Sequence, residues 1–292
     1  MIRGYDAITQ IYKRENFIET TQLNTSVEYE LFNGFYMSVG GEFCERRSLE
    51  GYRFIETVDE VLPNNQPSDF QTYQALIGDI DIWFVPMQKY MREPYRKVVL
   101  GSAWPTFSLN YEWGIPDLFG SDINHHYLQA SIEQTFKIGT IGTSNYRISG
   151  GKFLRSKILR DPDFKFQRRS DPLWFSNPLY SFQGLDTLLR TSDLSVEAHF
   201  VHHDNGSIIN KIPFMKKTRI GLVFGAGALY VREHDWFHYE GLVGLERNFK
   251  LSRRRLRVGI YGVLSNANKS APRADWKISF AILDDRNMKW DF

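Results

Sequence analysis

The chain has 292 residues, of which 42% are hydrophobic and 15% aromatic, and this apolar content excludes a disordered chain. Its 36 Lys and Arg nearly balance 34 Asp and Glu, which argues against nucleic acid as a partner. The single cysteine, Cys44, excludes an intrachain disulfide and a CxxC metal or redox site. A chain of this length suits one all-β domain.

Hydrophobic and polar residues alternate with period two from the first third of the chain onward. In residues 21–32, Leu23 and Val27 fall on one face, and Ser26 and Glu28 fall on the other. This alternation is typical of a strand with two different environments. The Asn33-Gly34 pair that follows predicts a hairpin with a type I′ turn, in which both central residues need positive φ.

The same alternation predicts strands along most of the chain. In chain order they cover residues 4–13, 21–32, 35–44, 72–85, 98–113, 127–137, 144–154, 193–203, 218–231, 237–246, 256–264 and 276–283. No run of about 18 apolar residues predicts a membrane helix, whereas Ile220 to Val231 suits a tilted membrane strand. The predicted fold is therefore an all-β, antiparallel transmembrane β-barrel with about 12 visible strands, a number that also fits a piece of a larger barrel.

The connections between the predicted strands alternate in length. Outer-membrane barrels have short turns on the periplasmic side and long loops outside. With Asn33-Gly34 placed inside, the outside loops are 48–71, 114–126, 155–192, 232–236 and 266–274, and the inside turns are 33–34, 86–97, 138–143, 204–217 and 252–254. The longest loops then lie outside and both termini inside, although two inside turns exceed the usual length.

The C-terminal third carries the clearest division between two faces. Phe237, Tyr239, Val243, Trp276, Ile278 and Phe280 are predicted to face lipid. His238, Glu240, Glu246, Arg257 and Lys277 occupy the alternate positions and are predicted to face the lumen. Charged residues that line a wet lumen explain these carboxylates better than an acid/base pair does.

No motif predicts a catalytic, cofactor or metal site. On a strand, His202 and His203 point to opposite faces, and His199 lies about 13 Å from His203, at roughly 3.3 Å per residue, which is too far for one zinc ion. Gly225-Ala226-Gly227 lacks the third glycine and the helix of a nucleotide loop, and close packing in a strand explains it better. We therefore expect no enzyme and no cofactor.

Several short stretches resemble a family of Bacteroidota outer-membrane proteins of unknown function. They are Leu118 to Asp122, Gly150-Gly151 through Leu154, Asn177-Pro178-Leu179 with Ser181-Phe182, His202-His203 through Asn205, Gly206, Asn210 and Pro213, and Leu245 to Arg247. In that family a carboxypeptidase-regulatory-like domain precedes a membrane barrel. The resemblance implies an outer-membrane location and a barrel, and it supplies no catalytic residue.

The start of the chain has no basic segment followed by an apolar one, so no signal peptide is predicted. Residues 1–292 are therefore expected to form the barrel domain at the C-terminal end of a longer protein. The expected function is a non-enzymatic channel or a platform for transport or assembly. The expected partners are outer-membrane lipid and other outer-membrane or periplasmic proteins.

Two alternatives stay open. A soluble β-sandwich that binds a glycan or peptide would also explain the strands and the aromatic content. A hydrolase housed in the barrel would use Asp161, Asp163, Ser170 or Asp171 together with His125 or His202.

Overall fold

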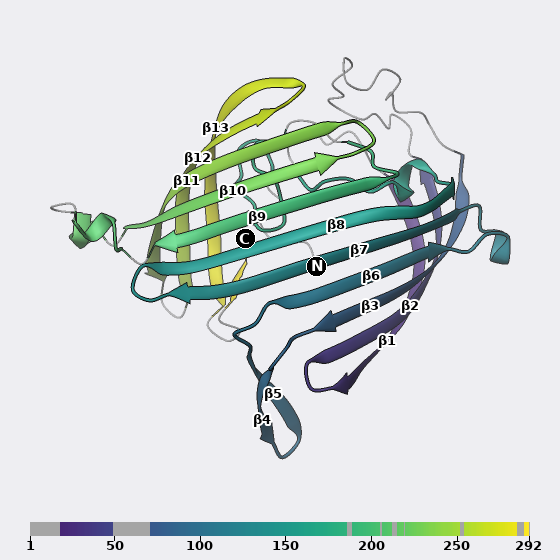
Figure 1. Ribbon diagram of the computed structural model, residues 1–292, viewed down its shortest axis with the longest axis horizontal. Coiled ribbons are helices and arrows are strands. Elements are labelled where there is room, and N and C mark those ends of the chain that lie inside the picture. Colours follow the sequence, from purple (N-terminus) through teal and green to yellow (C-terminus); the bar gives the residue numbers. More distant parts are fainter. Residues whose placement is uncertain are drawn as a thin grey trace.

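A computed structural model describes residues 18–48, 71–185, 189–204, 206–211, 215–218, 220–251, 254–284 and 289–291. The fold is all-β, as predicted. Twelve strands form one antiparallel sheet in the order β1-β2-β3-β6-β7-β8-β9-β10-β11-β12-β13-β14, and β4 and β5 form a separate hairpin. Each strand of the large sheet pairs with the next such strand along the chain, so the sheet is a simple meander (Figure 1).

The strands are β1 (Ile18–Phe32), β2 (Phe35–Ser48), β3 (Tyr73–Phe84), β4 (Lys89–Glu93), β5 (Arg96–Gly101), β6 (Thr106–Gly114), β7 (Asn124–Ile138), β8 (Gly142–Ile158), β9 (Leu194–Asp204), β10 (Ile220–Val231), β11 (Trp236–Leu251), β12 (Arg254–Ala267), β13 (Ser270–Asp284) and β14 (Lys289–Asp291). Four single 3-10 turns complete the elements: η1 (Leu118–Gly120), η2 (Asp161–Asp163), η3 (Ile209–Lys211) and η4 (Met215–Thr218). No helix in the described ranges is long and apolar enough to cross a membrane.

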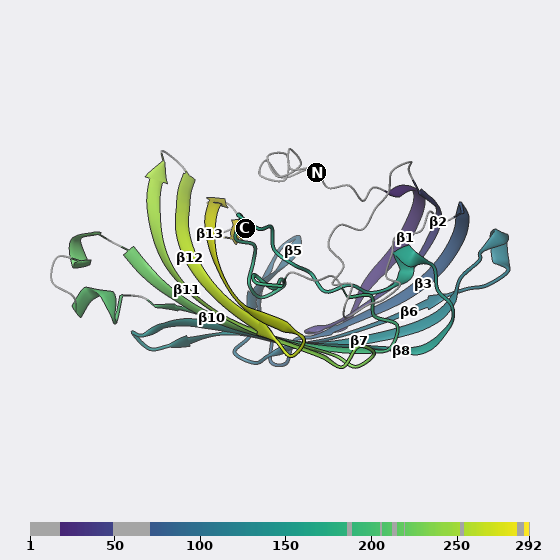
Figure 2. The ribbon, with the colours of Figure 1, turned by 90° about the horizontal axis from the view of Figure 1, so that it is seen from above.

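The large sheet curves into a trough, with β1 and β2 rising on one side and β12 and β13 on the other (Figure 2). In the described residues no pairing joins β1 to β13 or β14, so these strands are the two edges of the sheet. The antiparallel sheet is thus observed, and closure into a barrel remains a prediction. The predicted strand at 4–13 lies outside the described residues.

The β1–β2 turn and the segment 98–113 differ from the sequence-based prediction. Gly34 has positive φ (85°), but Asn33 does not, and the β1–β2 register shifts just before the turn, so the turn is not type I′. The predicted strand at 98–113 is two strands. Pro105 cannot donate to a ladder, and the Ser102 hydroxyl accepts a hydrogen bond from the Trp104 amide at 3.0 Å, which stabilises the bend between them.

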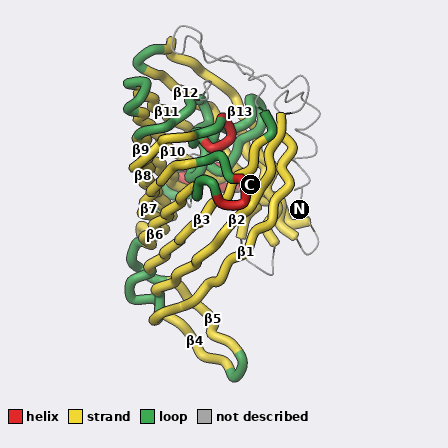
Figure 3. The backbone as a smooth tube through the Cα atoms, turned by 90° about the vertical axis from the view of Figure 1, so that its right-hand side faces the viewer, coloured by secondary structure: helices red, strands yellow, loops and turns green. Residues whose placement is uncertain are grey.

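A further difference concerns the inside turn predicted at 86–97. This segment forms most of the hairpin of β4 and β5, which extends past the end of the large sheet (Figures 1 and 3). The remaining strands agree with the predicted ones to within a few residues at most ends.

The two faces of the sheet differ in chemistry. Large apolar side chains are exposed on the convex face: Leu23, Val27, Tyr29, Val39, Phe107, Leu109, Ile132, Ile148, Val196, Phe200, Phe237, Tyr239, Val243, Leu245, Ile260, Leu264, Trp276, Phe280 and Ile282. Polar side chains are buried on the concave face: Ser38, Ser149, Ser195, His199, His238, Glu240, Glu246, Ser265, Lys277 and Ser279. The concave face also buries apolar side chains, among them Val201, Leu242 and Trp236, so it is mixed, whereas the convex face exposes an apolar surface wider than is usual for a water-soluble protein.

The connection between β8 and β9, residues 159–193, enters the concave side of the sheet (Figure 2), and we call it the inner loop. Its Phe182, Leu185 and Leu189 pack with residues of β10, β11 and β12, including Trp236. Its Phe175 packs in a second apolar cluster with Tyr261 of β12. The inner loop therefore covers apolar residues on the concave face that would otherwise be exposed.

Candidate functional site

The contact between the inner loop and β11 is centred on Glu240. The Glu240 carboxylate is buried, at 5% exposure, and accepts hydrogen bonds from the backbone N–H groups of Gln183 (2.8 Å) and Gly184 (2.7 Å). The Ser265 hydroxyl donates to the Gly184 carbonyl at 3.1 Å. Hydrogen bonds to a charged group are among the stronger ones. We call this contact the latch.

The space at the latch depends on two glycines. A Cβ on Gly184 would lie 2.5 Å from the Ser265 side chain. A Cβ on Gly227 of β10 would lie 3.0 Å from Glu240 and 3.2 Å from the Phe182 ring. Gly227 belongs to the Gly-Ala-Gly string in the sequence, so close packing explains this glycine.

A second contact adds a short segment of the inner loop to the edge of the sheet. The Phe175 N–H donates to the Ile278 carbonyl at 2.9 Å, and the Ile278 N–H donates to the Leu173 carbonyl at 3.0 Å. Trp174 thus forms a parallel bridge with Ile278 of β13. The Phe175 ring stacks on Tyr261 with 3.6 Å between centroids, so this segment is held by backbone and side chain together.

Three ion or polar contacts hold the loop elsewhere. Asp163 pairs with Arg46 of β2 and accepts from the Tyr73 hydroxyl of β3. The Lys165 ammonium lies 2.8 and 2.9 Å from the carboxylate oxygens of Glu112 of β6. Contacts thus reach from β2 to β13, across nearly the full width of the sheet.

Tyr180 adds a contact near the middle of the sheet. Its hydroxyl donates to the Glu133 carboxylate of β7 at 2.8 and 2.9 Å. Burial, followed by these hydrogen bonds, raises the pKa of Tyr180 to about 12. Its hydroxyl therefore stays protonated and able to donate at neutral pH.

The five residues predicted to face the lumen all lie on the concave face. His238 and Glu240 belong to the latch, with 3.5 Å between His Nε2 and Glu Oε2. Glu246 accepts from the Tyr261 hydroxyl at 2.5 Å and lies 3.4 Å from Arg257 Nε. Lys277, at 2% exposure, donates to the Ser170 hydroxyl at 3.2 Å and to the Asp171 carbonyl.

The residues considered for a hydrolase are not brought together. His202 bonds to Ser144 at 2.8 Å on the convex side, whereas Ser170 meets Lys277 on the concave side. His125 lies 3.1 Å from Glu112. In the part of the chain that the structure describes, no three His, Cys, Asp or Glu side chains converge as metal ligands would.

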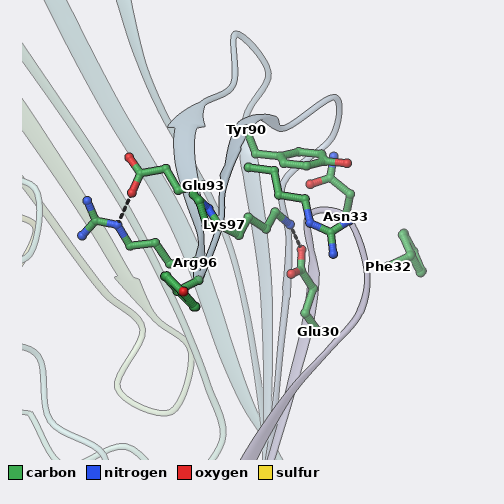
Figure 4. Close-up of a pocket in the computed structure, with 10 residues that line it drawn as sticks. Glu30, Phe32, Asn33, Tyr90, Glu93, Arg96 and Lys97 are labelled. Carbon is green, nitrogen blue, oxygen red and sulfur yellow. Dashed lines mark hydrogen bonds and ion pairs between the residues drawn. The ribbon is translucent and has the colours of Figure 1, made fainter.

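Two cavities lie next to the described strands, one at the end of the sheet and one on its concave face. The larger, about 520 Å³, lies between the β1–β2 turn and the hairpin of β4 and β5 (Figure 4). Lys97 pairs with Glu30 across it, and Arg96 pairs with Glu93 at 2.7 Å. The smaller, about 120 Å³, lies on the concave face under the start of the inner loop.

The residues of the resembling stretches lie in strands, turns and the inner loop. Gly150 and Gly151 lie in β8, Asn177 and Pro178 in the inner loop, His202 and His203 near the end of β9, Gly206 in the turn after it, and Asn210 in η3. Asn205 and Pro213 lie outside the described residues. The Asn177 carbonyl accepts from the Ser181 hydroxyl at 2.8 Å, so this motif shapes the bend that leads to the latch.

Residues 3–245 match the family described as "Family of unknown function (DUF5686) C-terminal domain". The chain belongs to this family. The DUF5686 match begins well before Leu118, the first residue of the resembling stretches, and it includes the whole inner loop and residues 236–245 of β11. A search of curated proteins finds no match.

Sequence reasoning missed the latch partners Gln183, Gly184 and Ser265. The two loop residues bind Glu240 through backbone N–H groups, which every residue except proline carries, so they have no sequence signature. The one available signal in this DUF5686 domain was the Ser181-Phe182 motif directly before them.

Proposed function

We propose that this chain is the membrane-spanning part of a non-enzymatic outer-membrane protein that acts as a channel or as a platform for transport or assembly. The observation that carries the proposal is the wide apolar surface on the convex face of the sheet. Trp276, Leu264 and Val243 on the convex face are 75%, 68% and 52% exposed. Such a wide apolar surface is typical of contact with a membrane or a partner.

The arrangement of the connections supports an outer-membrane orientation. The inner loop leaves the same end of the sheet as η1, while the Asn33-Gly34 turn lies at the opposite end. Long loops on one side and short turns on the other are the rule for outer-membrane barrels. In this proposal the edges at β1 and β13 close, directly or through further strands, because a lipid-exposed open edge is not tolerated.

A soluble β-sandwich fits these observations less well. A sandwich packs two sheets through apolar inner faces. Here one large sheet buries Glu240, Glu246 and Lys277 on its concave side, and in the described part of the chain only a two-stranded hairpin lies apart from it. The inner loop on the concave face makes the proposed barrel a plugged one.

Site-directed labels test the membrane proposal. Single cysteines are introduced at Val243 and Ile132 on the convex face and at Gln129 on the concave face, in a Cys44→Ala background. Nitroxide labels at 243 and 132 in lipid vesicles are expected to collide with oxygen in the bilayer, and the label at 129 with a water-soluble relaxation agent. Convex-face labels that report water instead would overturn the proposal.

A further inference from the structure

The smaller cavity carries an inference about a ligand. It is enclosed by β7, β8 and β9 on one side and by the start of the inner loop on the other. The lining residues are Tyr127, Gln129, Ser149, Gly151, Lys165, Phe166, Gln167, Ser195 and Glu197. Its volume, about 120 Å³, exceeds what a single water needs, roughly 10–15 Å³ by the same kind of measure.

Several polar groups in this cavity lack a partner within the described protein. The side-chain oxygen of Gln167 is buried without a hydrogen-bond partner among the described residues, and the hydroxyls of Tyr127, Ser149 and Ser195 line the cavity without a hydrogen bond to another described residue. Buried polar groups are almost always hydrogen-bonded. Three hydroxyls from three neighbouring strands are therefore available to a molecule in the cavity.

The charges of the cavity favour a ligand that donates hydrogen bonds. Glu197 lies 3.8 Å from His199 Nε2 and has no Lys or Arg partner among the described residues. Lys165 does not compensate it, because its ammonium is held by both carboxylate oxygens of Glu112 and lies 4.9 Å from the centre of the Tyr127 ring. A neutral ligand with hydroxyl groups would donate to Glu197 and accept from the hydroxyls of the wall.

The position of Tyr127 depends on a glycine of the family motif. A Cβ on Gly151 would lie 1.9 Å from the Tyr127 hydroxyl oxygen, so only glycine leaves room for that hydroxyl. A Cβ on the adjacent Gly150 would meet Ser195 O and Val196 at 3.7 Å, which is ordinary contact. The second glycine of the Gly-Gly pair thus shapes the cavity, and the first does not.

We propose that this cavity is a binding site for a small polyol, up to the size of one sugar ring. Aromatic side chains of Tyr127 and Phe166 would contact the C–H groups of such a ligand, and Glu197 and the hydroxyls would contact its O–H groups. Because Lys165 and Gln167 of the inner loop form part of the wall, a bound polyol also ties the loop to the sheet. The site goes beyond the proposed function and stands whether or not the sheet closes in a membrane.

Ligand-observed saturation-transfer NMR on the full chain, in a detergent without a sugar headgroup, tests the site. The probes are D-glucose and glycerol, with glycine betaine and inorganic phosphate as charged comparisons. We expect saturable binding of a polyol probe in the millimolar range, weakened about tenfold by Glu197→Gln, the loss expected for one charge-assisted hydrogen bond. Ser149→Ala supplies a second, smaller change in the wall if Glu197→Gln fails to fold.

The adjacent glycines provide the matched control. Gly151→Ala is expected to abolish polyol binding and Gly150→Ala to leave it unchanged. Absence of saturable polyol binding, binding of betaine or phosphate alone, or polyol binding that none of these variants weakens would overturn the site. Because binding is measured in detergent, the result is independent of the membrane-label experiment, and either proposal can fail alone.

Discussion

At the scale of single residues, Glu240 is the group on which the inner loop depends most directly. Its carboxylate presents two oxygens to two consecutive backbone N–H groups, those of Gln183 and Gly184, in a buried place. A buried donor that loses its acceptor keeps its full desolvation cost, about 1–3 kcal/mol. The latch is therefore sensitive to a change that removes only one acceptor.

Glu240→Gln is expected to loosen the inner loop by about 1–3 kcal/mol, because the amide offers one acceptor oxygen where the carboxylate offers two. Hydrogen exchange at the Gln183 and Gly184 amides measures the change. Glu133→Gln is the matched control, since among the described residues the Glu133 carboxylate accepts a hydrogen bond only from the Tyr180 hydroxyl. Equal exchange rates in both variants and the unaltered protein would contradict the latch.

At the scale of elements, the segment Leu173 to Phe175 extends the sheet at the edge of β13. Ile278 directs both its N–H and its carbonyl to this segment, and its cross-strand neighbour on the other side is Ile260 of β12. The preceding residue of β13 whose N–H points to the same edge is Trp276, which has neither a bridge nor a ring contact to the described part of the inner loop, whereas the Phe280 ring lies 5.6 Å from that of Trp174. One strand thus offers a loop-bound and a loop-free position of the same type.

Ile278→Pro is expected to release the segment, because proline removes the N–H that donates to Leu173 while leaving the bonds to β12 in place. Limited proteolysis within the inner loop is expected to become faster. Trp276→Pro introduces the same ring into the same strand, at a position without a bridge or ring contact to the described part of the loop, and controls for general damage to β13. Faster proteolysis in Trp276→Pro alone, or in neither variant, would show that the pairing does not hold the loop.

The period-two pattern sufficed to predict the strands, because each strand separates two environments along most of its length. The hairpin at Asn33-Gly34 was predicted correctly, but its turn type was not, since Gly34 alone takes positive φ and the β1–β2 register shifts just before the turn. The inward course of the inner loop could not be predicted either. It depends on backbone donors at Gln183 and Gly184 and on an edge at Ile278 more than 90 residues later in the chain.

At the scale of the whole molecule, the membrane proposal depends on the apolar convex face. In water this face would expose large side chains from nearly every strand of the sheet. In a bilayer the same side chains face hydrocarbon, and the polar concave face is screened from it. The cost of a charge on the convex face should therefore depend on depth and on the presence of lipid.

Val243→Arg is expected to cost about 2–4 kcal/mol of folding free energy in lipid vesicles, because Val243 lies mid-way along β11. Phe249→Arg lies on the same face of the same strand, near its end, and is expected to cost about 0–1 kcal/mol. Denaturant titration in vesicles measures both. Equal costs at the two positions would contradict a membrane-spanning sheet.

Closure of the sheet has its own test. Detergent-extracted protein is run on a denaturing gel with and without prior boiling. A closed barrel resists the detergent until it is boiled, so the unheated sample is expected to migrate as a separate band. A single band with the same mobility in both samples would contradict closure.

The pairing of Leu173 to Phe175 with β13 also sets an order of assembly. The segment precedes its partner Ile278 by about a hundred residues, and the strands β9 to β13 lie between them in the chain. Contacts between residues this distant in sequence carry a high loop-closure cost and form slowly. We therefore expect the intervening strands to pair before the segment docks on β13.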